Sequence, residues 1–164
     1  MTLCLFTCNG CTGDTSPSEL TVGELVASFP SSHLQTEAGL RQVVDTAAAS
    51  ERSIMFLYFP WAPMQPHQNR YAQFVIEYLH KHSDEPIMFH YVDCSRVSYG
   101  YAPFRSLPGW QEHEIDGQSL IHGEGELVWL EHGQVLHVER ILNFETASDL
   151  IAKTEQIMSL NTGG

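Results

Sequence analysis

Ile54-Met55-Phe56-Leu57-Tyr58-Phe59 is an unbroken apolar run in the first half of the chain. A strand with one buried and one solvent-exposed face would carry polar residues at alternate positions, and this run carries none. Strands buried on both faces belong to parallel sheets that are covered by helices on either side. The run therefore predicts the central strand of an α/β sheet.

A second run of the same character, IMFHYV, follows at residues 87–92. Pro66 suits the first turn of a helix between the two runs, and Glu77 and Lys81 are spaced to pair along it. The order strand, helix, strand predicts two parallel strands joined by a crossover. The apolar residues of the intervening helix recur at the spacing of a single helical face, and they are Tyr71, Phe74, Val75, Tyr78 and Leu79.

Two further elements are predicted before the central strand. From Thr36 onward a second helical stripe appears, made of Leu40, Val43, Val44, Ala47 and Ala48. Upstream, residues 21–24 (TVGE) resemble a capping box, in which Thr21 and Glu24 close the first turn of a helix. The short element that follows is either this helix, as far as Phe29, or a first strand over 25–29.

The second half of the chain begins with weaker signals. Residues 95–107 favour a short helix that Pro108-Gly109 would end. Residues 110–126 are polar, acidic and interrupted by glycine, which is typical of an inserted loop.

A hairpin and a last helix complete the prediction. Strands over 127–130 and 135–141 flank His132-Gly133, which suits a tight hairpin turn. Thr146, with Asp149 three residues later, can cap a final helix. The fold class expected is α/β, with a mixed central sheet flanked by helices and a polar insert before the final β-hairpin.

The length of 164 residues suits one domain with its own core. We expect a flexible leader over 1–19, a folded domain over 20–160 and a frayed tail over 161–164. The leader is expected to lack regular structure because turn-forming residues dominate it and no apolar periodicity appears.

Composition excludes some partners. With 8 basic against 20 acidic residues, the net charge is −12. Nucleic acid and anionic membrane surfaces are bound by Lys and Arg that displace counterions, so neither is expected as a partner. No apolar run reaches the roughly 18 residues of a membrane helix, so no membrane span is expected.

The compartment stays open. A cytoplasmic location is one interpretation. The alternative rests on the apolar residues 3–8, which look like the end of an export segment that stops at Cys8. If the true start lies upstream of Met1, the protein would be exported or lipid-anchored.

The predicted order of elements, with Trp61 directly after the central strand, resembles the thioredoxin superfamily. In that family the strand ends in a Trp, and Cys-Gly-Pro-Cys then opens the next helix. The matching stretch here runs from Trp61 through Ala62, Pro63 and Met64 to Gln65. Residues 126–135 also look like the family's final hairpin, including the glycine at its tip. The resemblance covers roughly residues 20–160.

The chain departs from the family pattern at the residues that carry its chemistry. A thiolate at the helix N-terminus is required, and Ala62 stands there; Gln65 stands where the resolving thiol belongs. The family's buried acid matches Phe56. The family's cis-proline matches Gly125, and an alternative register would assign Pro108 to that role. Dithiol exchange of the thioredoxin type is therefore not expected.

The resemblance implies what the remaining surface does, because in the family this edge of the sheet docks substrate peptides. We expect a redox-inactive domain that acts as a protein or peptide interaction module, with no cofactor. Trp110 and Tyr99 or Tyr101 belong to the same edge, and the alternative is that these aromatic residues pack beneath the insert. The binding residues expected on the degenerate active-site loop are Trp61, Ala62, Pro63, Met64, Gln65, Pro66 and Gly125.

Thiol chemistry of another design is the first alternative function. Cys8 and Cys11 form a CxxC in the leader. The two cysteines could form a disulfide or half of a metal site, Cys8 could carry a lipid, or the pair is incidental. Cys94 follows the second strand, where a buried small hydrophobe is the ordinary role and a redox-sensing thiol the alternative.

A divalent-metal site in the insert is the second alternative function. The spacing of its ligands matches no known pattern, and a solvated acidic loop is the ordinary explanation of these residues. His80 and His82 lie two apart on a helix, do not face each other and are expected at the surface. The candidate ligands of the insert are Glu112, His113, Glu114, Asp116, His122, Glu124 and Glu126.

Overall fold

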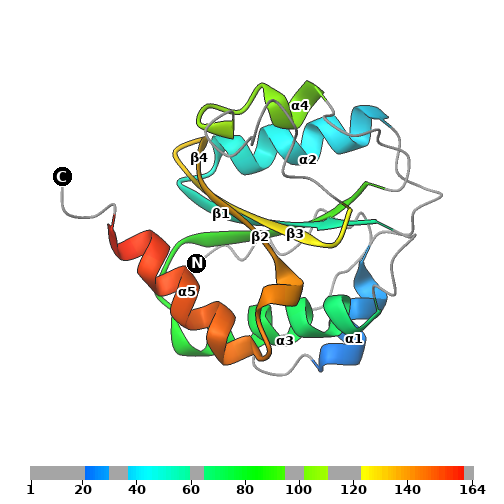
Figure 1. Cartoon of the computed structure of the whole chain (residues 1–164), viewed down its shortest axis with the longest axis vertical. Coiled ribbons are helices and arrows are strands. Elements are labelled where there is room, and N and C mark those ends of the chain that lie inside the picture. The colour runs from blue at the N-terminus through cyan, green and yellow to red at the C-terminus, as the bar shows by residue number, and fades with distance from the viewer. Residues whose placement is uncertain (1–20, 30–36, 60–64, 95–101, 111–122, 161–164) are drawn as a thin grey trace.

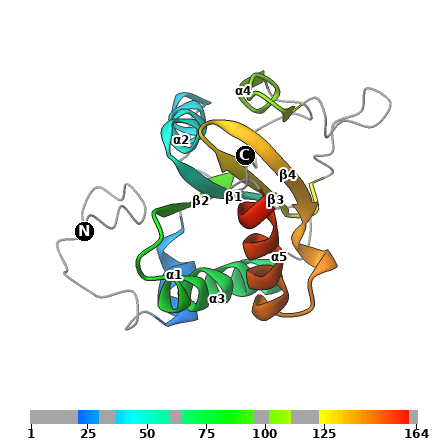
Figure 2. The same cartoon turned by 90° about the vertical axis from the view of Figure 1, so that its left-hand side faces the viewer.

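The computed structural model describes residues 21–29, 37–59, 65–94, 102–110 and 123–160. Within these ranges a four-stranded sheet carries helices on both faces. Figures 1 and 2 show α2 and α4 on one face and α1, α3 and α5 on the other. The predicted leader and tail fall on residues outside these ranges, so their boundaries stay predictions.

The sheet has the order β2-β1-β3-β4, with β1 (Arg52–Tyr58) in its interior. β1 pairs in parallel with β2 (Ile87–Asp93) and antiparallel with β3 (Glu126–Glu131). β3 and β4 (Gln134–Arg140) form the hairpin. The mixed α/β sheet flanked by helices that the sequence predicted is confirmed.

β1 is buried because helices cover both of its faces. Its central residues alternate between two clusters: Ile54 and Phe56 face α1, α3 and α5, while Met55 and Leu57 face α2 and α4. We call these two sides of the sheet the α3 face and the α2 face. The absence of polar alternation in the sequence of β1 follows directly from this double coverage.

The helices on the α3 face follow the predicted stripes. α3 (Gln65–Lys81) buries Tyr71, Phe74, Val75 and Tyr78, and Leu79 is half-buried beside them. α1 (Val22–Ser28) is a helix and not the strand that was the alternative interpretation. Its first turn is closed by the predicted capping box, with Glu24 N–H donating to the Thr21 hydroxyl over 3.3 Å.

The α2 face is covered by α2 (Glu37–Ala49) and the short α4 (Ala102–Arg105). Leu40, Val44 and Ala47 of α2 are buried there. The Ser53 hydroxyl donates to the Ala47 carbonyl over 2.9 Å, which ties the end of α2 to the start of β1.

The C-terminal elements close the α3 face. A 3₁₀ turn, η3 (Ile141–Asn143), leads from β4 toward α5 (Ala147–Leu160). α5 begins as predicted, with Asp149 N–H donating to the Thr146 hydroxyl over 3.2 Å and the Thr146 N–H donating back to the Asp149 carboxylate over 2.9 Å.

The hairpin turn is formed by the two predicted residues. His132 and Gly133 have φ values of 49° and 77°, as a two-residue turn with both central residues left-handed requires. A side chain at Gly133 is also excluded by space, because a Cβ there would lie 2.7 Å from the carbonyl oxygen of Ala48.

Two sequence predictions about polar residues are wrong. Lys81 does not pair with Glu77 along α3: its Nζ lies 2.6 Å from Glu155 of α5, and Glu77 accepts from Gln73. His82 is not a simple surface residue, because only 16% of its side chain is exposed.

The His82 ring lies between two carboxylates. Its Nδ1 lies 3.0 Å from Glu85 and its Nε2 lies 2.9 Å from Glu155, and the ring stacks on Tyr78 with centroids 4.4 Å apart. These contacts join the end of α3 to α5. His80, two residues earlier, is exposed as predicted.

Candidate functional site

The strand ends meet at one edge of the sheet, which is where the sequence placed the candidate site. Tyr58 at the end of β1 pairs with Asp93 at the end of β2, and Leu57 pairs with Glu126 at the start of β3. We call this the site edge. α3 starts beyond it with Gln65 and Pro66.

Only part of the predicted binding set lies within the described residues. Gln65 and Pro66 are exposed in the first turn of α3, and Gly125 directly precedes β3. The other four residues of the set, Trp61, Ala62, Pro63 and Met64, lie outside the described residues. Their predicted role in binding, like that of Gln65, Pro66 and Gly125, stays a prediction.

Gly125 and Pro108 are the two residues that the sequence could match to the family's cis-proline, and the structure shows where each one lies. Gly125 precedes Glu126, which pairs with Leu57 at the site edge. Pro108 lies at the opposite end of the sheet, because its carbonyl accepts from Val135 N–H over 2.8 Å at the start of β4, beside the hairpin turn. Gly125 thus lies at the site edge and Pro108 at the far end of the sheet. Which of the two matches the family's proline stays a prediction.

Gly125 is held in a left-handed conformation. Its φ is +84°, and its carbonyl accepts the Ile141 N–H over 2.8 Å. This hydrogen bond fixes the segment before β3 to the segment after β4. A backbone of this shape favours glycine, because other residues pay a steric cost at positive φ.

Aromatic rings pack beneath the site edge. Phe29 stacks on Tyr91 with centroids 4.2 Å apart, and Tyr58 stacks on the same ring at 5.5 Å. The Gln68 amide donates to the Tyr91 hydroxyl over 2.7 Å, and burial raises the pKa of that hydroxyl. The first turns of α3 are thereby fixed to the end of β2.

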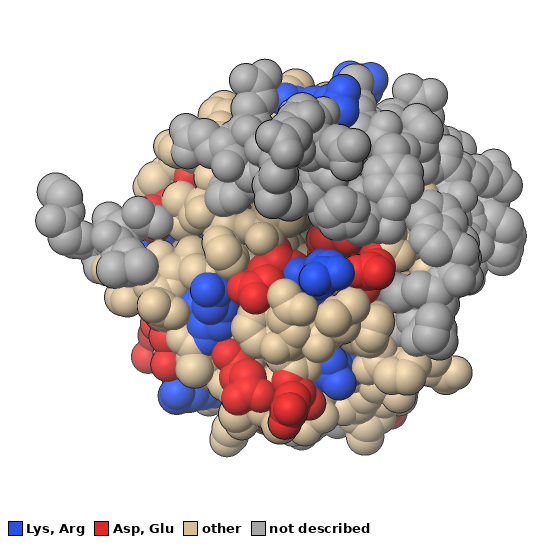
Figure 3. Space-filling view, viewed as in Figure 1, with Lys and Arg blue, Asp and Glu red and all other residues tan. Residues whose placement is uncertain are grey.

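Charged residues form the rim beside Gly125. Arg140 donates to the Glu124 carboxylate over 2.6 Å, and Arg70 donates to the Ile141 carbonyl over 3.2 Å. His67 lies near these groups: burial lowers its pKa, Arg70 lowers it further and Glu124 opposes the shift. In Figure 3, which shows one face of the molecule, acidic and basic side chains are intermixed and form no large patch of one sign.

Cys94 is the one cysteine within the described residues, and it is buried with no exposed surface. Its Sγ lies 3.7 Å from the Val92 carbonyl. Burial raises the pKa of the thiol well above its ordinary value, and the nearby Asp93 and Glu126 raise it further. A thiol that is buried and protonated is a poor nucleophile, so the geometry favours the ordinary role of Cys94 as a small core residue.

Cys8 and Cys11 lie outside the described residues. Their predicted alternatives, a disulfide, a metal half-site, a lipidated Cys8 or an incidental pair, are unchanged by the structure.

Asp93 and Glu126 are two buried carboxylates that the sequence did not single out at this edge. They are 3% and 0% exposed, and they flank β1 on its two sides. Glu126 was expected at the end of a solvated insert but is the first residue of β3, where its Oε1 accepts the Glu124 N–H over 3.3 Å. The sequence signal that could have predicted this burial is the position of Glu126 directly before the apolar residues 127–130.

The other end of the predicted insert is also buried. Trp110 is 1% exposed and packs against Phe104, with centroids 6.0 Å apart. Trp110 therefore lies in the core of the described structure. The prediction that it packs beneath the insert concerns residues outside the described ranges and stays a prediction. Tyr99 and Tyr101 lie outside the described residues.

The metal hypothesis finds no cluster within the described ranges. Among those residues, no group of three or more His, Cys, Asp or Glu side chains is placed to hold a metal ion. Glu124 is paired with Arg140, and Glu126 is buried at the start of β3. The other candidate ligands of the insert lie outside these ranges, namely Glu112, His113, Glu114, Asp116 and His122.

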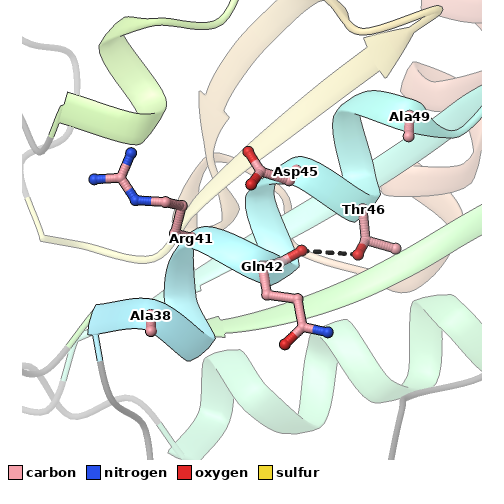
Figure 4. Close-up of a pocket in the computed structure, with 6 residues that line it drawn as sticks. All are labelled: Ala38, Arg41, Gln42, Asp45, Thr46 and Ala49. Atoms are coloured by element: carbon pink, nitrogen blue, oxygen red, sulfur yellow. Dashed lines mark hydrogen bonds between the residues drawn. The ribbon is translucent and has the colours of Figure 1, made fainter.

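A shallow hollow of about 510 Å³ runs along the exposed side of α2 (Figure 4). The Thr46 hydroxyl that lines it donates to the Gln42 carbonyl over 2.7 Å, and Asp45 is the single carboxylate among the described lining residues. Those residues offer neither a nucleophile with a base nor a set of metal ligands. Separately, none of the helices in the described part of the chain has the length and apolar character needed to cross a membrane.

Comparison with known proteins gives similarities of shape alone. No family model and no curated protein sequence matches the chain. Trxlp from Edwardsiella tarda EIB202 is 15% identical over 73% of this chain and 93% of its own, with a TM-score of 0.38. A chain from the complex of ferredoxin:thioredoxin reductase with thioredoxin f2 is 14% identical over 75% of this chain and 90% of its own, with a TM-score of 0.38.

Proposed function

We propose that this chain is a thioredoxin-like domain that performs no dithiol exchange and binds a protein or peptide at the site edge. The observation that carries the proposal is the start of α3. Gln65, an exposed amide, opens the helix where a resolving thiol would have to lie. The one thiol in the described residues, Cys94, is buried and its pKa is raised.

Rigid support beneath the site edge favours a binding role. The ring stack of Phe29, Tyr91 and Tyr58 and the hydrogen bond from Gln68 fix the end of β2 against α3. The hydrogen bond between Ile141 and Gly125 fixes the other side. A surface whose support is already ordered loses little conformational entropy when a partner binds.

The absence of dithiol chemistry is tested by reduction of insulin disulfides with dithiothreitol. The wild-type protein is compared with a variant in which Cys4, Cys8, Cys11 and Cys94 are all replaced by Ser. We expect both proteins to match the control without protein. Turnover by the wild type that is lost in the cysteine-free variant would contradict the proposal and assign the activity to Cys94 or to the Cys8/Cys11 pair.

The thiol of Cys94 is tested separately in a variant that keeps it as the only cysteine. We expect the native protein to react with a disulfide reagent many times more slowly than the same protein in urea, because burial keeps the thiol protonated and covered. Equal rates in both conditions would show that Cys94 is accessible in the native protein and would support the alternative function as a thiol-dependent oxidoreductase.

Binding at the site edge is tested with a photo-crosslinking amino acid at position 65. The matched control carries the same group at Gln156, which is exposed on α5. We expect a discrete adduct from position 65 in a cell extract, with none from position 156, and competition by excess unlabelled protein. Equal capture at both positions would contradict binding at this edge.

A further inference from the structure

His90 is a half-buried histidine on the face of the sheet that α2 covers. It is the middle residue of β2, pairs in register with Met55 of β1, and precedes Val92 by two residues. Val92 and Met55 both lie on the α2 face, so the alternation of the strand places His90 there too. α2 covers that face with Leu40, Val44 and Ala47.

The surroundings of His90 suit a neutral ring. Its Nε2 is buried and has no hydrogen-bond partner among the described residues. Burial lowers the pKa of His90 to about 4. Its backbone is better satisfied, because the His90 carbonyl accepts from the Tyr71 hydroxyl over 3.0 Å on the other face.

No charged group in the described elements around His90 is placed to balance a proton on the ring. Arg41 and Asp45 of α2 are exposed, and Figure 4 shows both side chains on the side of α2 that is turned away from β2. Asp93 alternates to the α3 face, and the Cys94 thiol is held protonated. Met55, the neighbour across β1, is apolar.

We propose that His90 is an acid-sensitive latch: protonation of its imidazole releases α2 from the sheet. With α2 docked, an imidazolium at this position has no acceptor for its buried N–H; with α2 released, water solvates it. The release would uncover the apolar residues beneath α2, among them Met55, Leu57 and Val92.

We expect α2, and not β2, to separate from the sheet, because α2 makes fewer hydrogen bonds to it. β2 is hydrogen-bonded to β1 over Ile87–Asp93, whereas α2 contacts the sheet through apolar side chains and the hydrogen bond from Ser53 to Ala47. Separating a helix that packs on a sheet breaks fewer hydrogen bonds than separating two paired strands.

The direction of the pH dependence follows from the two proton affinities. A released His90 titrates near 6.5 and the docked one has a pKa of about 4, so the released form binds more protons between these values. Docking is therefore fully favoured above pH 6.5 and weakens as the pH falls toward 4. The equilibrium constant for release rises on the order of 100-fold between pH 7 and pH 4.

The experiment is hydrogen exchange of the full chain at pH 7, 5.5 and 4, read by mass spectrometry and corrected for intrinsic exchange rates. We expect peptides from α2 to lose protection on the order of 100-fold in acid, while peptides from α5 in the same sample lose much less. His90→Leu and His90→Gln, neither of which titrates, should keep α2 protected at pH 4.

His80→Gln is the matched control, because His80 is exposed on α3 and lies away from α2. It should respond to acid as the wild type does. If α2 opens in acid equally in wild type and in both His90 variants, or if α5 opens together with α2 in the wild type, the latch is overturned. Continued protection of α2 at pH 4 in the wild type overturns it too, since the protonated ring would then reach solvent without moving the helix.

Discussion

Both the backbone conformation and the neighbouring atoms require glycine at position 133. Its φ of +77° is strained for any side chain, and a Cβ would collide with the Ala48 carbonyl oxygen at 2.7 Å. The turn that Gly133 completes thus also sets how closely the end of α2 approaches the hairpin.

Replacement of Gly133 by Ala should lower the free energy of unfolding by about 2 kcal/mol or more, from positive φ and the contact with Ala48 together. Urea unfolding followed by tryptophan fluorescence measures this. Gly23→Ala is the control: Gly23 is in α1 with nothing within 4 Å of the added Cβ. That change should stabilise the protein by about 0.5–1 kcal/mol, and equal effects of the two changes would contradict this account.

A buried hydrogen bond between Trp129 and Thr154 joins β3 to α5. The indole N–H donates to the Thr154 hydroxyl over 3.0 Å, and neither residue has exposed surface. Thr154→Val keeps the size of the side chain and leaves the indole without an acceptor, at a cost of about 1–3 kcal/mol. Thr154→Ser keeps the acceptor and loses one methyl group, at a cost of about 1 kcal/mol.

Urea unfolding of the two Thr154 variants distinguishes polar from apolar stabilisation. We expect Val to be the more destabilising substitution. If Ser proves worse than Val, packing of the methyl group outweighs the hydrogen bond to Trp129.

Individual polar contacts were the part that the sequence predicted least well. Lys81 was expected to pair with Glu77 within α3, but Glu155 of α5 is its partner, and His82 shares that carboxylate. Spacing along a helix identifies candidate partners within that helix alone. A partner on another element depends on how the two helices pack, which no local pattern specifies.

At the scale of elements, the correct predictions came from short sequence patterns with a direct physical cause. The unbroken run of β1 predicted a strand covered on both faces, and His132-Gly133 predicted the hairpin turn. The element over 22–28 stayed ambiguous between helix and strand because it is too short for periodicity to decide, and the capping box was the better guide. Of the site, the edge was predicted and the burial of Asp93 and Glu126 was not.

The capping box of α5 offers an element-scale prediction. Thr146→Ala removes the acceptor for the Asp149 N–H and should cost about 1 kcal/mol of stability. Hydrogen bonds from Thr146 lower the pKa of Asp149 in the folded protein. The ionised Asp149 carboxylate therefore stabilises the fold at neutral pH, and this stabilisation is lost as the pH falls through the lowered pKa.

Thermal unfolding of Thr146→Ala and wild type at pH 7 and pH 2.5 tests both statements. The difference between the two proteins should shrink as acid protonates Asp149. Glu145→Ala, next to the cap, is the control and should unfold close to the wild type at both pH values. A difference that does not depend on pH would contradict the role of the Asp149 carboxylate.

At the scale of the molecule, the described structure divides its core between two faces of one sheet. The cluster on the α3 face and the cluster on the α2 face meet only through the strands. The capping box at Thr21 closes α1 through contacts within residues 21–24. The described fold therefore needs no residue before Thr21 to begin its first helix.

Deletion of residues 1–19 should leave the midpoint of thermal unfolding within about 2 °C of the full chain, a shift that corresponds to less than about 1 kcal/mol. Circular dichroism at 222 nm measures it. A fall of 5 °C or more would show that the predicted leader contributes to the folded domain and would move the domain boundary upstream.

The interior position of β1 has a consequence for the order in which the protein is made. β1 acquires its parallel neighbour once residues 87–93 have been synthesised, but its antiparallel neighbour is residues 126–131. A nascent chain on the ribosome thus holds an apolar strand with one open side until β3 has emerged. Chaperones that bind exposed apolar segments would meet the chain in that interval, and a slow stretch of translation before β3 would lengthen it.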